Sequence, residues 1–175
     1  MECLDLLKID LKGLESDVVE RHVTLNDTYF AAIEATEVRQ GHVDVDITIH
    51  KMTDTVFEVL FHTYGTVLVP CDLCLDDMEQ EVSADQRIIV KLGKEYSEED
   101  ELIVVDENEG MLDATWLVYE SIALAIPIRH VHAPGKCNAS MTEKLNEFSA
   151  ARSSEADGEH AIDPRWSALG KLLNS

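Results

Sequence analysis

Apolar and polar side chains alternate most regularly in the middle of the chain. Residues 43–49 alternate aliphatic with polar side chains, and the same period of two recurs in residues 56–64 and 78–92. Successive side chains of a β-strand point to opposite faces of a sheet, so this period predicts half-buried strands. Because only short turns separate them, these strands are predicted to form an antiparallel meander.

Shorter apolar runs lie before this central region. Residues 18–25 predict another strand, and residues 4–14 predict an opening strand or loop. Residues 29–33 fit a short helix, with Asn26-Asp27 as its N-cap, about as well as they fit a strand. Gly65 interrupts a strand pattern, and a glycine inside a strand indicates a β-bulge there.

The longest apolar run predicts a helix that covers the sheet. Residues 114–125 are apolar on nearly every side, Asp113 precedes them as a capping residue, and Pro127 ends the run. Such a helix is buried, so its lone charge, Glu120, should point outward or pair with Arg129. We therefore predict an α+β fold in which an antiparallel β-meander is covered by one buried helix.

The composition changes beyond the predicted core. We expect a globular α+β domain in residues 1–140, a flexible acidic tail or linker in residues 141–162, and a short amphipathic C-terminal helix in residues 163–175. Asp163 caps the last segment and Pro164 takes the first helical position. A helix on such a tether either docks back on the domain or binds a partner.

Charge restricts the partners that this chain can bind. Its 175 residues include 14 basic and 35 acidic side chains, which gives a formal net charge of −21. Such a protein repels phosphate, so direct binding of naked RNA is not expected, whereas a basic partner is. No secretory signal and no apolar run of about 20 residues is visible, which predicts a cytoplasmic protein outside the membrane.

Four residues could form a metal site around a C-x-x-C motif. Cys71 and Cys74 have the spacing of a knuckle whose two thiolates bind one ion, and cytoplasmic thiols stay reduced. His132 and Cys137, after the apolar helix, are the best candidates for the other two ligands of a structural zinc ion. His130 could replace His132, since both lie on one side of an extended segment. Plain reduced thiols in a turn are the simpler interpretation.

Catalysis by these cysteines is the alternative hypothesis. A thiol-dependent or metal-dependent enzyme, acting in redox chemistry or on RNA, would use the C-x-x-C motif. The motif lies between predicted antiparallel strands, and Asp72, Asp76 and Asp77 are expected to raise the pKa of its thiols. The chain has neither a G-x-S-x-G nor an H-E-x-x-H motif. These features favour a protein without enzymatic activity.

Several segments together resemble the YceD family of bacterial large ribosomal RNA subunit accumulation proteins. They are Val69-Pro70-Cys71-x-x-Cys74-Leu75, the run that ends in Ala125-Ile126-Pro127-Ile128, His132-x4-Cys137, and Asp163-Pro164-Arg165-Trp166. Some family members carry a second full C-x-x-C after the helix, where this chain has Cys137 with His132 as the stand-in. The resemblance implies a non-enzymatic role in the synthesis, processing or stability of large-subunit ribosomal RNA. With the charge, it implies a basic ribosomal protein or pre-ribosomal ribonucleoprotein as partner.

Overall fold

The computed structural model describes residues 2–35, 37–94, 97–99 and 102–148 of the chain. The chain divides into two compact units, Met1–Thr142 and Glu143–Ser175. The sheet, its covering helices and the cysteine residues discussed below all belong to the first unit. The predicted C-terminal helix in residues 163–175 lies outside the described residues.

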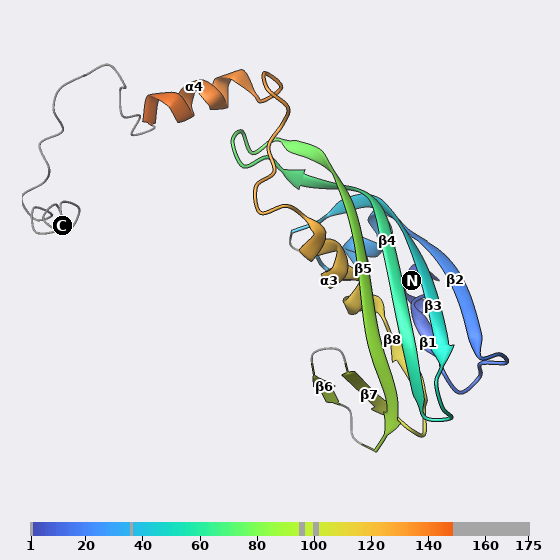
Figure 1. Cartoon of the computed structure of the whole chain (residues 1–175). Coiled ribbons are helices and arrows are strands. Elements are labelled where there is room, and N and C mark those ends of the chain that lie inside the picture. Colours follow the sequence, from blue (N-terminus) through green and yellow to red (C-terminus); the bar gives the residue numbers. More distant parts are fainter. Residues whose placement is uncertain (1, 36, 95–96, 100–101, 149–175) are drawn as a thin grey trace, which may run out of the picture. The chain divides into compact units, whose positions relative to one another are not determined.

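A six-stranded sheet with the order β2-β3-β4-β5-β7-β6 dominates the first unit (Figure 1). Its strands are β2 (Val18–Leu25), β3 (Gln40–Lys51), β4 (Val56–Pro70), β5 (Asp77–Gly93), β6 (Ser97–Glu99) and β7 (Leu102–Asp106). Strands β2 to β5 form the predicted antiparallel meander, because each pairs with its neighbour in the chain. A separate two-stranded ladder joins β1 (Lys8–Asp10) to β8 (Met111–Asp113).

Two details of the sheet differ from the predictions. Strand β7 pairs with β5 in parallel, along the register from Ile89↔Leu102 to Gly93↔Asp106, so the sheet is not a pure meander. Gly65 does not form a bulge, because it pairs without any shift in register with Val43 on one side and Val82 on the other. A Cβ atom at Gly65 would lie 2.2 Å from the His42 carbonyl oxygen, so close backbone approach explains the glycine.

One face of the sheet builds the core and the other faces solvent. The burial pattern alternates along β3 and β4 as the period of two requires. Helix α2 (Asp27–Ala32) contacts β2 and β3 and buries Tyr29 and Phe30. As predicted, Asn26 is its N-cap: the Asn26 side chain accepts a hydrogen bond from the Thr28 main-chain N–H at 3.0 Å. The short helix α1 (Glu2–Asp5) contacts α2.

Helix α3 (Thr115–Ala125) packs on β4 and β5 through one face only. It buries Leu117, Val118, Tyr119, Ser121 and Ile122, and the Ser121 hydroxyl lies 3.1 Å from the hydroxyl of Thr63 on β4. The opposite face carries Trp116 and Leu124, which are exposed, so the apolar residues all round the helix are not all buried. Glu120 does not pair with Arg129 in the described structure but accepts a hydrogen bond from the Trp116 indole N–H.

Helix α4 (Ala139–Phe148) occupies the first part of the segment predicted as a linker. Asn138 caps it, since the Asn138 side-chain oxygen accepts hydrogen bonds from the main-chain N–H groups of Ser140 and Met141. The rest of the predicted linker lies outside the described residues. No helix in the described part of the chain has the length and apolar character needed to cross a membrane.

Candidate metal centre

The turn between β4 and β5 carries the C-x-x-C motif, as the sequence predicted. Strand β4 ends at Pro70 and β5 begins at Asp77, so Cys71 and Cys74 lie in the connection. The main-chain N–H of Cys71 donates to the Asp76 carbonyl, and the Cys71 carbonyl accepts from the Leu75 N–H, both at 2.9 Å. The Leu73 N–H donates to the Cys71 sulfur at 3.4 Å. The turn is therefore held by its own backbone, with both cysteines buried.

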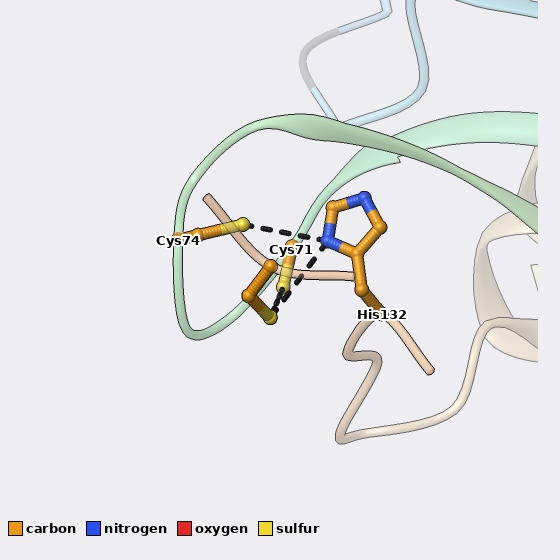
Figure 2. Close-up of side chains that lie close together, drawn as sticks. Cys71, Cys74 and His132 are labelled. Carbon is orange, nitrogen blue, oxygen red and sulfur yellow. Dashed lines mark hydrogen bonds between the residues drawn. The ribbon is translucent and has the colours of Figure 1, made fainter. Parts of the chain in front are cut away.

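The segment after α3 supplies two more donor atoms to this turn. His132 Nδ1 lies 3.3 Å from the Cys74 sulfur and 4.0 Å from the Cys137 sulfur, and the Cys71 and Cys137 sulfurs are 3.9 Å apart. All four ligand atoms lie within 4.8 Å of one another. Figure 2 shows the side chains of Cys71, Cys74 and His132 pointing toward one another. We call these four residues the Cys3His cluster, because they comprise three cysteines and one histidine.

His130 lies outside the cluster, and hydrogen bonds of its main chain connect the β4–β5 turn to the segment after α3. The Asp72 main-chain N–H donates to the His130 carbonyl at 3.0 Å, and the His130 N–H donates to the Asp72 carboxylate at 2.8 Å. Farther along, the Asn138 amide donates to the Asp76 carboxylate at 3.1 Å. Geometry thus selects His132 over His130 as the residue that joins the cysteines. The roles of Asp72, Asp76 and Asn138 were not predicted, because hydrogen bonds between distant segments leave no periodic signal in a sequence.

The spacing of the Cys3His cluster suits a tetrahedral zinc ion. Zinc–sulfur bonds of about 2.3 Å and zinc–nitrogen bonds of about 2.0 Å place tetrahedral sulfur atoms about 3.8 Å apart, and sulfur and nitrogen about 3.5 Å apart. The Cys71–Cys137 sulfur distance of 3.9 Å and the distances of 3.3 and 4.0 Å from His132 Nδ1 to the Cys74 and Cys137 sulfurs lie close to these values. Three thiolates and one imidazole are also a common ligand set of closed, structural zinc sites.

The pKa values of two thiols of the cluster are shifted in opposite directions. Burial raises the pKa of Cys71, but hydrogen bonds from the Cys74, His132 and Leu73 main-chain N–H groups and from the His132 side chain lower it to about 6. This corrects the expectation that neighbouring aspartates would raise it. Burial raises the pKa of Cys137 to about 11, together with hydrogen bonds and repulsion from Cys71 and Cys74. A bound cation would relieve the repulsion that three adjacent thiolates otherwise suffer.

The solvent-facing side of strands β2 to β5 carries most of the acids of the sheet. We call this surface the acidic face; its carboxylates are Glu20, Asp44, Asp46, Glu58, Asp77, Glu79, Glu81 and Asp85. One row crosses four strands as His22↔Asp46↔His62↔Asp85, with Nδ1–carboxylate contacts of 2.7 and 2.6 Å. The sequence showed the alternation in each strand but not the register that aligns these side chains.

Comparison with known proteins identifies the family of this chain. Among curated proteins and among solved structures, no match to the chain was found. A family model described as "Large ribosomal RNA subunit accumulation protein YceD" matches residues 59–173. The match includes all four residues of the Cys3His cluster, strands β5 to β8 and helix α3, and it covers most of the chain. The chain therefore belongs to the YceD family of large ribosomal RNA subunit accumulation proteins.

Proposed function

We propose that this protein is a non-enzymatic cytoplasmic factor in the synthesis, processing or stability of large-subunit ribosomal RNA. The family name, which refers to accumulation of that RNA, supports the biological role. We further propose that the protein acts by binding a basic ribosomal protein or a pre-ribosomal ribonucleoprotein through its acidic face. The net charge of −21 is the observation that carries this mode of action.

Electrostatics supports a basic protein, and not RNA, as the direct partner. Proteins that bind the phosphate backbone do so by neutralising phosphates with lysine and arginine. On the acidic face, Arg87 lies beside Glu58 at 2.6 Å, so part of the positive charge there is already neutralised. The face therefore presents a negative potential, which attracts a basic protein and speeds its association.

We propose a structural role for the Cys3His cluster. A zinc ion bound there would tie the β4–β5 turn to the segment that follows α3, two regions far apart in sequence. The ion would supply the cross-link, while the hydrogen bonds of Asp72 and Asn138 orient the two segments. Strands β4 and β5, which this turn joins, carry part of the acidic face, so the cross-link would stabilise the conformation of the binding surface.

One observation favours thiol chemistry as a second candidate function. The pKa of Cys71 falls to about 6, which makes the thiolate available near neutral pH. Reactive cysteines, however, are at least partly exposed, whereas the exposed fractions of Cys71 and Cys74 are 0% and 1%. A metal ligand also requires the thiolate form, so the same acidity supports the structural site.

Two histidines close together in sequence provide a matched test of the zinc site. We expect His132→Ala to weaken zinc affinity by more than about 100-fold, because it removes a ligand atom, and His130→Ala by about 10-fold or less. The main-chain hydrogen bonds of His130 with Asp72 survive its truncation. Metal content after dialysis against a chelator, with a competition titration, measures both. Equal zinc affinity in the two variants would contradict this ligand assignment.

The biological proposal is tested by deleting the gene and restoring it on a plasmid. We expect deletion to reduce large ribosomal subunits in gradient profiles and to alter the amount of large-subunit RNA, with recovery on complementation. In parallel, the tagged full-length protein should capture basic ribosomal proteins after nuclease treatment, and high salt should release them because it screens the attraction. Normal subunit profiles would overturn the proposed role, and capture of naked RNA without ribosomal proteins would overturn the proposed partner.

A further inference from the structure

Within the described part of the chain, strand β5 has an unpaired edge along most of its length. Its other side pairs with β4 from Asp77 to Lys91, but β7 covers only Ile89–Gly93. Residues 77–86 therefore have no backbone partner on that side among the residues that the structure describes. We call this stretch the free edge. The Gln80 side-chain amide, which donates to the Glu81 carbonyl at 2.8 Å, covers one of its acceptors. At about 3.3 Å per residue, the free edge is long enough to pair with a strand of about ten residues.

The charge of the free edge selects against one class of partner and for another. Residues Asp77, Glu79, Glu81 and Asp85 alternate along it, all on the acidic face and all exposed. A second copy of this chain would bring the same acids against them, and like charges on neighbouring strands are destabilising. An extended basic segment would instead form pairs of opposite charge with them.

The other edge of the sheet is less suited to this role. Strand β2 is also a terminal strand, but glutamate occurs there once, as Glu20, between apolar and basic neighbours. The Arg21 side chain extends toward the preceding segment and donates to the Lys8 carbonyl at 3.5 Å. Length and charge therefore both favour β5.

Helix α3 adds a requirement on the other face of the incoming strand. It contacts β5 on the core side of the sheet, and Figure 1 shows it beside that strand. A strand added next to β5 would project every second side chain toward the core side of the sheet, beside the partly buried Met78 of β5, where apolar residues would pack.

We propose that the free edge binds an extended segment of a partner protein by strand addition, and that this segment alternates basic with apolar residues. The proposal rests on the proposed function in one respect, since the segment would belong to the basic protein inferred above. The main-chain groups of β5 would supply the pairing, Glu79 and Glu81 would select basic side chains, and the core side of the sheet would accept the apolar ones.

A synthetic decapeptide of alternating lysine and valine tests this mode of binding with the full-length protein. We expect saturable binding by fluorescence anisotropy, and slowed hydrogen exchange of amides within residues 77–86. The same peptide with N-methyl groups on two consecutive central residues keeps its charge but blocks both backbone edges. It should bind at least about tenfold more weakly. Equal affinity of the two peptides, or protection on β2 instead of β5, would overturn the proposal.

Paired variants separate the local charge from the overall charge of the protein. The double variant Glu79→Gln and Glu81→Gln should weaken binding of the lysine–valine peptide by about tenfold at low salt. Glu20→Gln on β2 removes charge from the same face at the opposite edge, and we expect less than about a twofold effect. Similar losses from both changes would mean that only the net charge matters and would overturn site-specific binding.

The outcomes distinguish this inference from the proposed function. If deletion of the gene reduces large subunits but the lysine–valine peptide leaves the exchange of residues 77–86 unchanged, the function stands and the free-edge proposal fails. If the peptide pairs with the free edge while subunit profiles are normal without the gene, strand addition stands and the proposed function fails.

Discussion

Replacing Cys71 with serine is expected to release bound zinc and to lower the free energy of unfolding by about 3 to 4 kcal/mol when free zinc is 100 to 1,000 times its dissociation constant. The thiolate of Cys71 is a ligand that a serine hydroxyl replaces poorly, because zinc prefers soft sulfur donors in such sites. The structure gives the reason for so large an effect. The Cys71 sulfur lies in the shared centre of two segments more than fifty residues apart, 3.9 Å from that of Cys137.

The measurement is chemical unfolding with and without a chelator, combined with metal analysis of the purified protein. Cys3→Ser is the matched control, since Cys3 is the remaining cysteine of the sequence and belongs to α1. It should retain zinc and unfold like the parent protein. A Cys71→Ser variant that still carries zinc, or a parent protein whose stability does not respond to the chelator, would contradict the structural role.

Replacing Gly65 with alanine is expected to destabilise the protein by about 3 to 5 kcal/mol, because two separate penalties add. The new Cβ atom would lie 2.2 Å from the His42 carbonyl oxygen and 2.7 Å from Val43 Cα, both on the backbone of β3. Backbone atoms inside a paired ladder move only if the strands separate. The φ angle of 157° at Gly65 is also one that L-residues rarely adopt.

Gly135→Ala is the control for the backbone penalty alone. Gly135 has a φ angle of 80°, but nothing lies within 4 Å of a Cβ atom built there. We expect a loss of about 1 to 2 kcal/mol, measured in the same urea titrations. If Gly65→Ala lowers the free energy of unfolding no more than Gly135→Ala does, the close approach of β3 and β4 adds no penalty at this position.

The sheet shows which structural features local sequence patterns predict and which they do not. Alternation along β3 and β4 correctly predicted strands, their buried faces and an antiparallel order, because each property depends on neighbours in sequence. The parallel pairing of β7 with β5 depends on where the chain goes after Gly93, which alternation does not encode. The bulge predicted at Gly65 was wrong for the same reason. A glycine within a strand pattern fits a bulge and a close approach of two backbones equally well.

The Cys3His cluster shows the same division within one site. The C-x-x-C spacing located the turn and indicated the ligand type, and the position of His132 and Cys137 just after the apolar helix made them the candidates for the other two ligands. His130 and His132 were equivalent in the sequence, because both alternate onto one side of an extended segment. The tertiary structure removes that equivalence. Hydrogen bonds with Asp72 hold His130 against the β4–β5 turn, whereas the side chain of His132 points toward the cysteines.

By itself, the sequence determined the strands of the meander, the turn with two cysteines, a strongly acidic composition and the likeness to a family. These depend on residue type and short-range spacing. Only the tertiary structure decided which histidine joins the cysteines, which acids share one face and which side of β5 lacks a partner. Each of these depends on register and packing between distant segments, and a one-residue change in register would move every side chain of a strand to the opposite face.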